Sequence, residues 1–364
     1  MAGAPRPMVL IRSLHAWAGL LLCLLIAAIA LSGTLLTARP LWRQLAYAEQ
    51  ARPWTAPDAA GLGREAERVA ALFAGEVRGL RPPDPDFAGW EVMLKDGGGA
   101  LVDAETLAVV SRWDRGGTLM DWLFQLHHYL LLGKGGELVV GTLGLTVLVF
   151  IGTGIALWTS WPGRHSYRPW PKTGRRRGLL DWHRDFGTLL TPLLLLTAIT
   201  GVSLCFGPAA RAILGVLPAG SVVAAPPPAP ASPGPGWAAA TAEAMRQFPA
   251  ASIRRIGPAP DGVLTFRLRQ PAEWHPNGRT VVRIDTTTGT LLERTDALAQ
   301  PRGERIYNTV YPLHGGFVGG LPWRLAIGLT GLVLAGLSLT GGWCFLKMQL
   351  SRRQAVARRV KAGV

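Results

Sequence analysis

Four of the seven histidines recur at matched positions in the two halves of the chain. The imidazole side chain is a good ligand for iron, and two imidazoles on opposite sides of a flat macrocycle complete a six-coordinate iron centre. Four imidazoles arranged as two facing pairs would therefore make two redox centres. The four residues are His15 and His127 in the first half, and His183 and His314 in the second.

Glycine spacing defines the repeat. His15 and His183 are each followed by glycine at the fourth and eighteenth positions, and His127 and His314 by glycine at the sixth, fourteenth, seventeenth and twenty-seventh. Glycine accounts for 45 of the 364 residues, so this many coincidences are not expected by chance. We therefore predict an internal duplication in which each half is a helix, an outer domain and a second helix, the halves being parallel repeats. The glycines also indicate helices that approach each other closely.

Four charge-free apolar runs predict four transmembrane helices. Each run is long enough to cross a hydrocarbon core of roughly 30 Å at about 1.5 Å per residue. The first run could instead be a secretory signal, but it exceeds the usual apolar length of such signals and contains His15, so we expect it to be retained. Pro192 should kink the third helix. The runs are Leu14–Thr37, Leu138–Trp161, Phe186–Phe206 and Leu325–Leu346.

Essentially all of the net charge of +15 lies in three segments, which four spans place on one side of the membrane. These are residues 1–13, residues 161–184 and the tail after Leu346, and Asp181 is the one acidic residue among them. An excess of Lys and Arg marks the cytoplasmic side of a membrane protein, so both termini should be cytoplasmic. No basic stripe with interleaved aromatic residues remains, so we expect no binding to nucleic acid.

The predicted fold is an all-α four-helix transmembrane bundle with two small α+β domains outside the cytoplasm. In the first domain we expect a helix at Gly63–Phe73 and strands within Trp90–Leu94 and Ala100–Ser111; in the second, a helix at Ala238–Phe248 and strands within Leu264–Leu268 and Thr280–Arg294. Asp103 and Asp285 precede equivalent turns, and Pro218–Pro235 reads as an extended linker. The predicted segments are 1–13, 14–37 (first span), 38–137 (first outer domain), 138–161 (second span), 162–185 (basic loop), 186–206 (third span), 207–324 (linker and second outer domain), 325–346 (fourth span) and 347–364.

Topology sorts the four histidines into two pairs. His15 and His183 open the first and third spans at the cytoplasmic face, and His127 and His314 precede the second and fourth spans at the outer face. We expect each pair to ligate one haem iron, with interfacial anchoring or structural hydrogen bonding as the alternative role. The three cysteines lie inside spans and form no Cys-x-x-Cys-His motif, so both haems should be haem b, bound without covalent attachment. His128 neighbours His127 and is the alternative outer ligand.

Basic residues beside the histidines are candidates for holding the anionic haem propionates. The alternative is ordinary positive charge that flanks a span. The candidates are Arg12 and Arg184 on the inner side, and Lys134 and Arg324 on the outer side. Of the remaining histidines, we expect His165 to be solvated in the basic loop. We expect His275 to be a turn residue, with substrate contact as the alternative.

These motifs resemble the PepSY-associated transmembrane family over roughly residues 11–346. The resemblance implies inner-membrane ferric-siderophore reductases of bacteria, built from four helices with haem inside, and PepSY-like outer domains. It would make His15, His127, His183 and His314 the haem ligands. It rests on RSLHAWAGLLL (Arg12–Leu22), FQLHHYLLLGKGG (Phe124–Gly136), TGIALW (Thr153–Trp158), LLDWHRDFGTLL (Leu179–Leu190) and YPLHGGFVGG (Tyr311–Gly320), and more loosely on VVRIDTTTG (Val281–Gly289).

Three functions compete at this stage. The first is a dihaem reductase that delivers electrons to a ferric siderophore outside the cytoplasm. The second is a dihaem cytochrome for another acceptor, such as a quinone, a thiol or a copper centre. The third is a haem-free, membrane-tethered regulatory or binding protein. The chain shows no Rossmann or P-loop motif, so the electron donor of a reductase would be a separate molecule.

Overall fold

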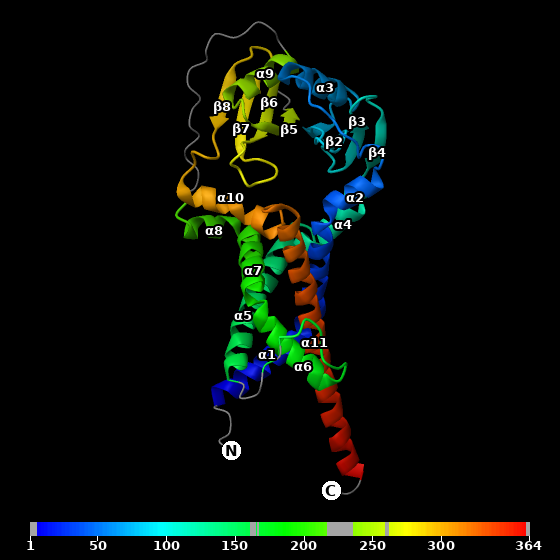
Figure 1. Cartoon of the computed structure of the whole chain (residues 1–364), viewed down its shortest axis with the longest axis vertical. Coiled ribbons are helices and arrows are strands. Elements are labelled where there is room, and N and C mark those ends of the chain that lie inside the picture. Colours follow the sequence, from blue (N-terminus) through cyan, green and yellow to red (C-terminus); the bar gives the residue numbers. More distant parts are fainter. Residues whose placement is uncertain (1–5, 161–164, 166, 217–235, 259–261, 362–364) are drawn as a thin grey trace. The chain divides into compact units, whose positions relative to one another are not determined.

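The computed structural model describes residues 6–160, 165, 167–216, 236–258 and 262–361, and it divides into two compact units (Figure 1). The helical unit comprises residues 1–37, 123–206 and 313–364, and the sheet unit comprises residues 38–122 and 207–312. The chain therefore passes between the units several times. The predicted Pro-rich linker, Pro218–Pro235, lies outside the described residues, as does Trp161 at the end of the predicted second span.

Long apolar helices build the helical unit. Three of them are long and apolar enough to cross a membrane: α1 (Arg6–Thr37), α5 (Lys134–Thr159) and α11 (Gly320–Lys361). Two consecutive helices, α6 (Arg176–Leu189) and α7 (Thr191–Cys205), are apolar and long enough for a fourth crossing only when they are taken together as one bent span. A chain with these helices is a membrane protein, because so much exposed apolar surface is stable only in lipid.

The α6–α7 pair is sharply bent. The axes of α6 and α7 differ by 70°. Leu190 ends α6 and begins α7, and Pro192 lies in the first turn of α7. Proline has no backbone N–H to donate and clashes with the carbonyl four residues earlier, so it starts a helix readily but cannot continue one. The kink expected at Pro192 is therefore a break between two helices.

Small residues bring α1 and α11 into close contact. Ala27, Ala30 and Ala335 form a buried apolar cluster between them. A Cβ added to Gly331 would lie 2.8 Å from the carbonyl oxygen of Ala30, and Thr34 donates a hydrogen bond to the carbonyl of Gly328 at 3.1 Å. The two backbones therefore approach more closely than larger side chains would permit, as is typical of helices packed in lipid.

The sheet unit contains one antiparallel sheet of eight strands, in the order β4-β3-β2-β1-β5-β6-β7-β8. The prediction of two separate outer domains is therefore corrected: each supplies four strands, and β1 pairs with β5 through Leu80 and Ile256. β1 and β5 were not foreseen. The strands are β1 (Val77–Arg81), β2 (Gly89–Leu94), β3 (Gly99–Asp103), β4 (Val109–Trp113), β5 (Ser252–Pro258), β6 (Val263–Arg269), β7 (Thr280–Asp285) and β8 (Leu291–Thr295).

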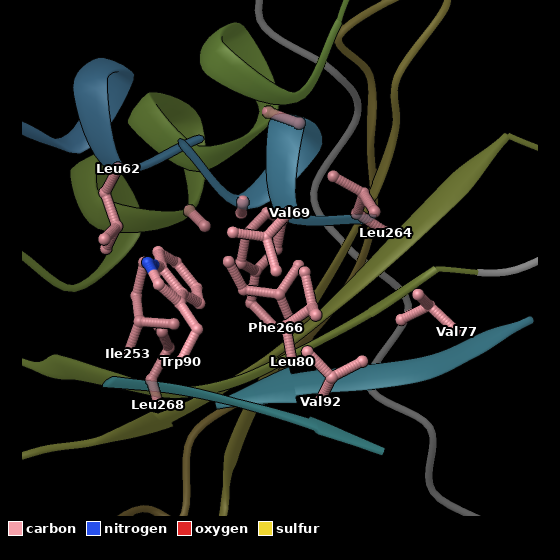
Figure 2. Packing of buried hydrophobic residues seen from close by; sticks show 14 of the residues in the cluster. Leu62, Val69, Val77, Leu80, Trp90, Val92, Ile253, Leu264, Phe266 and Leu268 are labelled. Carbon is pink, nitrogen blue, oxygen red and sulfur yellow. The ribbon is translucent and has the colours of Figure 1, made fainter. Parts of the chain in front are cut away.

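Two helices cover one face of this sheet (Figure 2). α3 (Ala59–Ala71) and α9 (Trp237–Gln247) touch at Gly63, where an added Cβ would lie 2.5 Å from the carbonyl oxygen of Trp237. Beneath them, Trp90 and Phe266 are fully buried in a core shared by both sets of strands. Because the core is continuous across the β1–β5 junction, the two halves of the sheet stabilise each other.

Shorter helices link the units or lie beside the sheet. They are α2 (Arg39–Ala46), α4 (Leu119–Tyr129), α8 (Gly207–Ile213) and α10 (Arg302–His314). α4 precedes α5, and Leu130 and Leu131 between them have positive φ angles of 48° and 61°. α10 likewise precedes α11 through Gly316, Gly319 and Gly320, with positive φ. His127 and His314 thus belong to short helices that end just before a long apolar helix begins.

The turn after Asp103 has the same hydrogen bonds as the turn after Asp285. Each carboxylate accepts hydrogen bonds from the backbone N–H groups two and three residues later. The fourth residue is Leu107 in one turn and Gly289 in the other, with φ of 57° and 71°. Asp103 is also bound by Gln50 and Arg52, and these hydrogen bonds hold the pKa of its carboxyl well below its usual value although burial opposes them.

Candidate functional site

The helical unit brings the four repeated histidines together as two pairs. His15 on α1 and His183 on α6 have ring centroids 6.4 Å apart. His127 on α4 and His314 on α10 have ring centroids 6.1 Å apart. These are the two combinations that topology indicated from the sequence. Each pair joins one histidine from the first half of the chain to one from the second.

The Nδ1 atom of each of these histidines is held by a hydrogen bond. It lies 2.8 Å from the Thr153 hydroxyl for His15, 2.9 Å from the Leu337 carbonyl for His183, 2.8 Å from the Ile29 carbonyl for His127 and 3.1 Å from the Thr197 carbonyl for His314. A carbonyl only accepts, and Thr153 already donates its proton to the Val149 carbonyl. All four Nδ1 atoms therefore carry the proton, which leaves Nε2 of each neutral ring with a free lone pair.

The outer pair is anchored in the same way in both halves of the chain. Ile29 and Thr197, whose carbonyls bind His127 and His314, each stand fourteen positions after the first histidine of their half. Three positions further on, the hydroxyl of Ser32 lies 3.4 Å from Nδ1 of His127. The hydroxyl of Thr200 lies 3.1 Å from Nδ1 of His314. Each histidine therefore rests against a helix of its own half, α1 for His127 and α7 for His314.

Glycines support the edges of three of these rings. A Cβ added to Gly33 would lie 2.6 Å from Cε1 of His127, and one added to Gly201 would lie 3.0 Å from Cε1 of His314. At the inner pair, a Cβ on Gly341 would lie 3.0 Å from Cε1 of His183. In each case Nε2 is the ring nitrogen further from the glycine. Any larger residue would push the ring away from its present position.

The ring spacing suits two imidazoles on one metal ion. Imidazole nitrogens bind transition metals at about 2 Å and lie about 1 Å from the ring centre, so imidazoles on opposite sides of an ion have centroids roughly 6 Å apart. The measured 6.1 Å and 6.4 Å match this value. Each pair supplies two nitrogens only; among the described residues, no group of three or more His, Cys, Asp or Glu side chains is placed to hold a metal ion. The residues present therefore fit an ion whose other ligands come from a macrocycle.

The two pairs lie at different levels of the helical unit. α1 carries His15 of the inner pair and, fourteen residues later, the Ile29 carbonyl that binds His127 of the outer pair. At about 1.5 Å per residue this separation is about 21 Å along α1. It is shorter than the ~30 Å that a full span would give.

His128 has a different environment from His127. Its ring stacks on Phe124, with centroids 5.3 Å apart, and lies 4.4 Å from the ring of Tyr129. Its Nδ1 is buried and has no hydrogen-bond partner among the described residues. His127, and not His128, has its ring facing that of His314.

The four basic candidates differ in what they contact. Arg184 is held by acidic neighbours, with its Nε 2.7 Å from Asp185 and a second ion pair to Asp181. It is thus already neutralised by protein carboxylates. Arg12 and Lys134 are exposed, and the backbone and side chain of Arg324 pack against Gly316.

The expectation that His165 is solvated is wrong. Its Nδ1 lies 3.1 Å from the fully buried carboxylate of Asp185, and its ring lies 4.5 Å from that of Trp158. Asp185 explains the difference. A buried carboxylate requires several partners, and His165 is one of them.

His275 is more than a turn residue of the sheet unit. It is buried, and its ring stacks on Tyr311 of α10 with centroids 5.0 Å apart. Burial, and then the charges of Arg279, Arg267 and Arg269, lower its pKa to about 3. It also lines a cavity of about 450 Å³ within the sheet unit.

Comparison with known families identifies this architecture. The model of the PepSY-associated TM region matches residues 12–347. The chain belongs to the PepSY-associated transmembrane family. The match includes all four paired histidines of this PepSY-associated protein and both sets of strands. No curated protein matches the chain.

Several residues of this PepSY-associated protein acquire a role only from the structure. Sequence reasoning used the repeated glycines as helix-packing positions, whereas Gly33, Gly201 and Gly341 contact histidine rings. It also missed Thr153 and the three carbonyls as partners of Nδ1. Hydroxyl residues at one common offset, Ser32 and Thr200, are a sequence signal that could have indicated the outer sites and was not used.

Proposed function

We propose that this membrane protein is a dihaem electron-transfer protein that reduces ferric siderophores outside the cytoplasm. His15 and His183 would ligate the inner haem, and His127 and His314 the outer one. The proposal includes an internal duplication, a four-helix bundle, and a bacterial inner-membrane location with both termini cytoplasmic. Electrons would come from a separate donor on the cytoplasmic side or in the membrane.

One observation carries the proposal: two histidine pairs share one ring spacing and one tautomer. Four Nδ1–H groups are bound to the protein, so four Nε2 lone pairs remain for iron. Anchored imidazoles of this kind are typical of metal ligands, whose other nitrogen is oriented by a hydrogen bond.

The duplication is supported by the equivalent anchors of the outer pair. Ile29 and Thr197 occupy one offset in the two halves, and Gly33 and Gly201 another, and each contacts the second histidine of its own half. Independent sequences would not place a carbonyl and a glycine at two shared offsets beneath two matched histidines. The halves therefore combine to make each pair.

When bound, haem would supply one-electron chemistry between Fe(III) and Fe(II). The chain's own contribution is to hold four imidazoles in fixed orientations and at two levels. Gly33, Gly201 and Gly341 leave room for the rings, and the Nδ1 bonds raise the basicity of the ligating nitrogens. A ferric siderophore that receives an electron releases its iron more easily, because hard oxygen donors favour Fe(III) over Fe(II).

The first test is a visible spectrum with haem quantitation on the purified full-length protein. We expect a Soret band, an α band after dithionite reduction, and two haems per chain. His15→Ala, His127→Ala, His183→Ala and His314→Ala should each retain about half the haem, and His128→Ala, the matched control beside His127, should retain all of it. A colourless wild-type protein would refute the proposal in favour of a haem-free binding protein.

The second test addresses the acceptor. The dithionite-reduced protein, freed of excess reductant under argon, is mixed with a ferric siderophore, and Fe(II) is captured by a coloured chelator. We expect the amount of haem oxidised, measured as loss of the α band, to equal the amount of Fe(II) captured by the chelator. Reoxidation by a quinone but not by any ferric siderophore would instead identify a cytochrome that serves another acceptor.

A further inference from the structure

A cavity in the sheet unit is lined by an unusual set of basic side chains. The cavity has a volume of about 450 Å³, within the range of roughly 300–1,000 Å³ that small-molecule sites occupy. The loop between β6 and β7 forms one wall, and the N-terminal half of α10 forms another. Arg279 comes from the first wall, and Arg302 and Arg305 come from the second.

These three arginines have no ion-pair partner among the described residues. The one acidic side chain that lines the cavity, Glu273, is committed elsewhere: its carboxylate accepts hydrogen bonds from the backbone N–H of Gln270 and the hydroxyl of Thr280. It also accepts from the backbone N–H of Arg279, so it closes the β6–β7 loop and does not neutralise the guanidinium. The cavity therefore keeps a net positive charge.

Arg279 is the most constrained of the three. Its Nε is buried and makes no hydrogen bond within the described part of the chain. Burial, and then the charges of Arg267 and Arg211, lower the pKa of its guanidinium. Arginine stays protonated even so, and a buried guanidinium nitrogen without an acceptor is costly. An anion in the cavity would offset the positive charge that Arg279 shares there with Arg302 and Arg305.

The lining of the cavity also includes exposed apolar side chains. Trp274 is 51% exposed and Ile306 is 43% exposed. α10 also begins here, at Arg302, and the positive end of a helix dipole favours an anion. A ligand that suits both features has negatively charged oxygens and an organic body that can contact Trp274 and Ile306.

We propose that this cavity binds an anionic ferric chelate whose donors are carboxylates, as in a ferric citrate complex. The inference rests on the proposed function, because it specifies the class of iron carrier that the protein reduces. Guanidinium groups bind carboxylates through paired N–H donors. Neutral or cationic hydroxamate chelates offer fewer anionic acceptors for these donors.

The decisive experiment measures binding without any redox step. Gallium(III) citrate has the charge of the ferric complex but is not reduced by the protein, so calorimetry on the full-length protein in detergent reports the cavity alone. We expect saturable binding that weakens roughly tenfold in Arg279→Gln and severalfold in Arg302→Gln. The matched control Arg64→Gln, an exposed arginine on α3, should bind as the wild type does.

Arg302 and Arg305 are exposed, so their glutamine variants test the site without disturbing the core if Arg279→Gln fails to fold. Gallium citrate that does not bind the wild type overturns the inference, as does metal-free citrate that binds as tightly. If the protein reduces a neutral ferric hydroxamate while failing to bind gallium citrate, the reductase function stands and the cavity assignment falls. If gallium citrate binds but the protein holds no haem and has no reductase activity, the cavity assignment stands and the reductase function falls.

Discussion

His183 donates its Nδ1 proton to the carbonyl oxygen of Leu337, with 2.9 Å between the two atoms. His183 lies on α6 and Leu337 on α11, so this bond fixes an imidazole from the bent crossing against the longest helix of the molecule. A backbone carbonyl can only accept a hydrogen bond, whereas a side-chain hydroxyl can donate or accept one. The ring is thus held in one tautomer by an atom that no side-chain substitution removes.

His15 is the one histidine of the four for which the described residues provide a side-chain hydroxyl and no backbone carbonyl at Nδ1, and this partner, Thr153, can be deleted. In Thr153→Val the Nδ1–H of His15 loses its acceptor at nearly constant volume. Loss of a partner of this kind costs about 10–100-fold in metal affinity and makes the ligand less basic. We expect weaker retention of the inner haem and a higher midpoint potential for one of the two haems in a spectroelectrochemical titration.

Thr142→Val is the matched control for that substitution. Thr142 lies on the same helix, α5, and its hydroxyl donates only to the Leu138 carbonyl within that helix. Its potentials should equal those of the wild type. Identical titrations for Thr153→Val and Thr142→Val would mean that the His15 hydrogen bond does not tune an iron centre.

The glycine beneath His127 gives a second prediction. The Cβ of Gly33→Val would lie 2.6 Å from Cε1 of His127, so the ring must move. We expect the outer haem to be lost and about half of the total haem to remain by the pyridine haemochrome assay. Gly19→Val is the control on the same helix, because nothing lies within 4 Å of the Cβ it adds. Full haem occupancy in both variants would contradict the outer site.

The crossing of α1 and α11 should be sensitive to added volume. Gly331→Val places its Cβ 2.8 Å from the Ala30 carbonyl, whereas Gly152→Val on α5 meets nothing within 4 Å. Overpacking a close contact costs about 1–3 kcal/mol. In detergent, the melting temperature of Gly331→Val should fall by several degrees, and that of Gly152→Val should stay at the wild-type value. Equal melting temperatures would show that the two helices adjust without cost.

His275 predicts a pH dependence of stability for the sheet unit. Its pKa is lowered to about 3 in the folded protein, against about 6.5 for an unfolded histidine. The unfolded chain therefore binds the proton first, so the stabilisation is present above pH 6.5 and is lost as the pH falls towards 3. From pH 7 to pH 5 this loss is about 2 kcal/mol. The melting temperature should drop over that interval, and the drop should be smaller in His275→Gln; equal drops in both proteins would exclude His275 as its source.

Local sequence patterns were enough to place the histidines at two levels, because the repeat and the positive charges determine which helix ends meet. They were not enough to find the groups that hold Nδ1. Nδ1 of three histidines binds the backbone carbonyls of Ile29, Thr197 and Leu337. Every residue has such a carbonyl, so residue type does not indicate which one binds a histidine. In the sequence, Thr153 was noted only as the first residue of the TGIALW motif.

The single sheet was missed for a different reason. β1 and β5 have arginines and glycines within short stretches, such as Arg78, Gly79, Arg255 and Gly257, so neither shows clean alternation of apolar and polar residues. Their pairing also joins segments far apart in the chain, which local patterns do not reveal. The contact of His165 was not predicted because nothing in the local sequence indicates that its partner, Asp185, is buried.

The pairing of Leu80 with Ile256 at the centre of the sheet has a consequence for biogenesis. The segment between these residues contains α5, α6 and α7, so β1 is synthesised long before its neighbour exists. Until two further passages through the bilayer are complete, the edge of β1 keeps its backbone N–H and C=O groups unpaired, and such edges recruit other strands. The pair between β1 and β5 can therefore form only after the apolar helices α5, α6 and α7 have been synthesised.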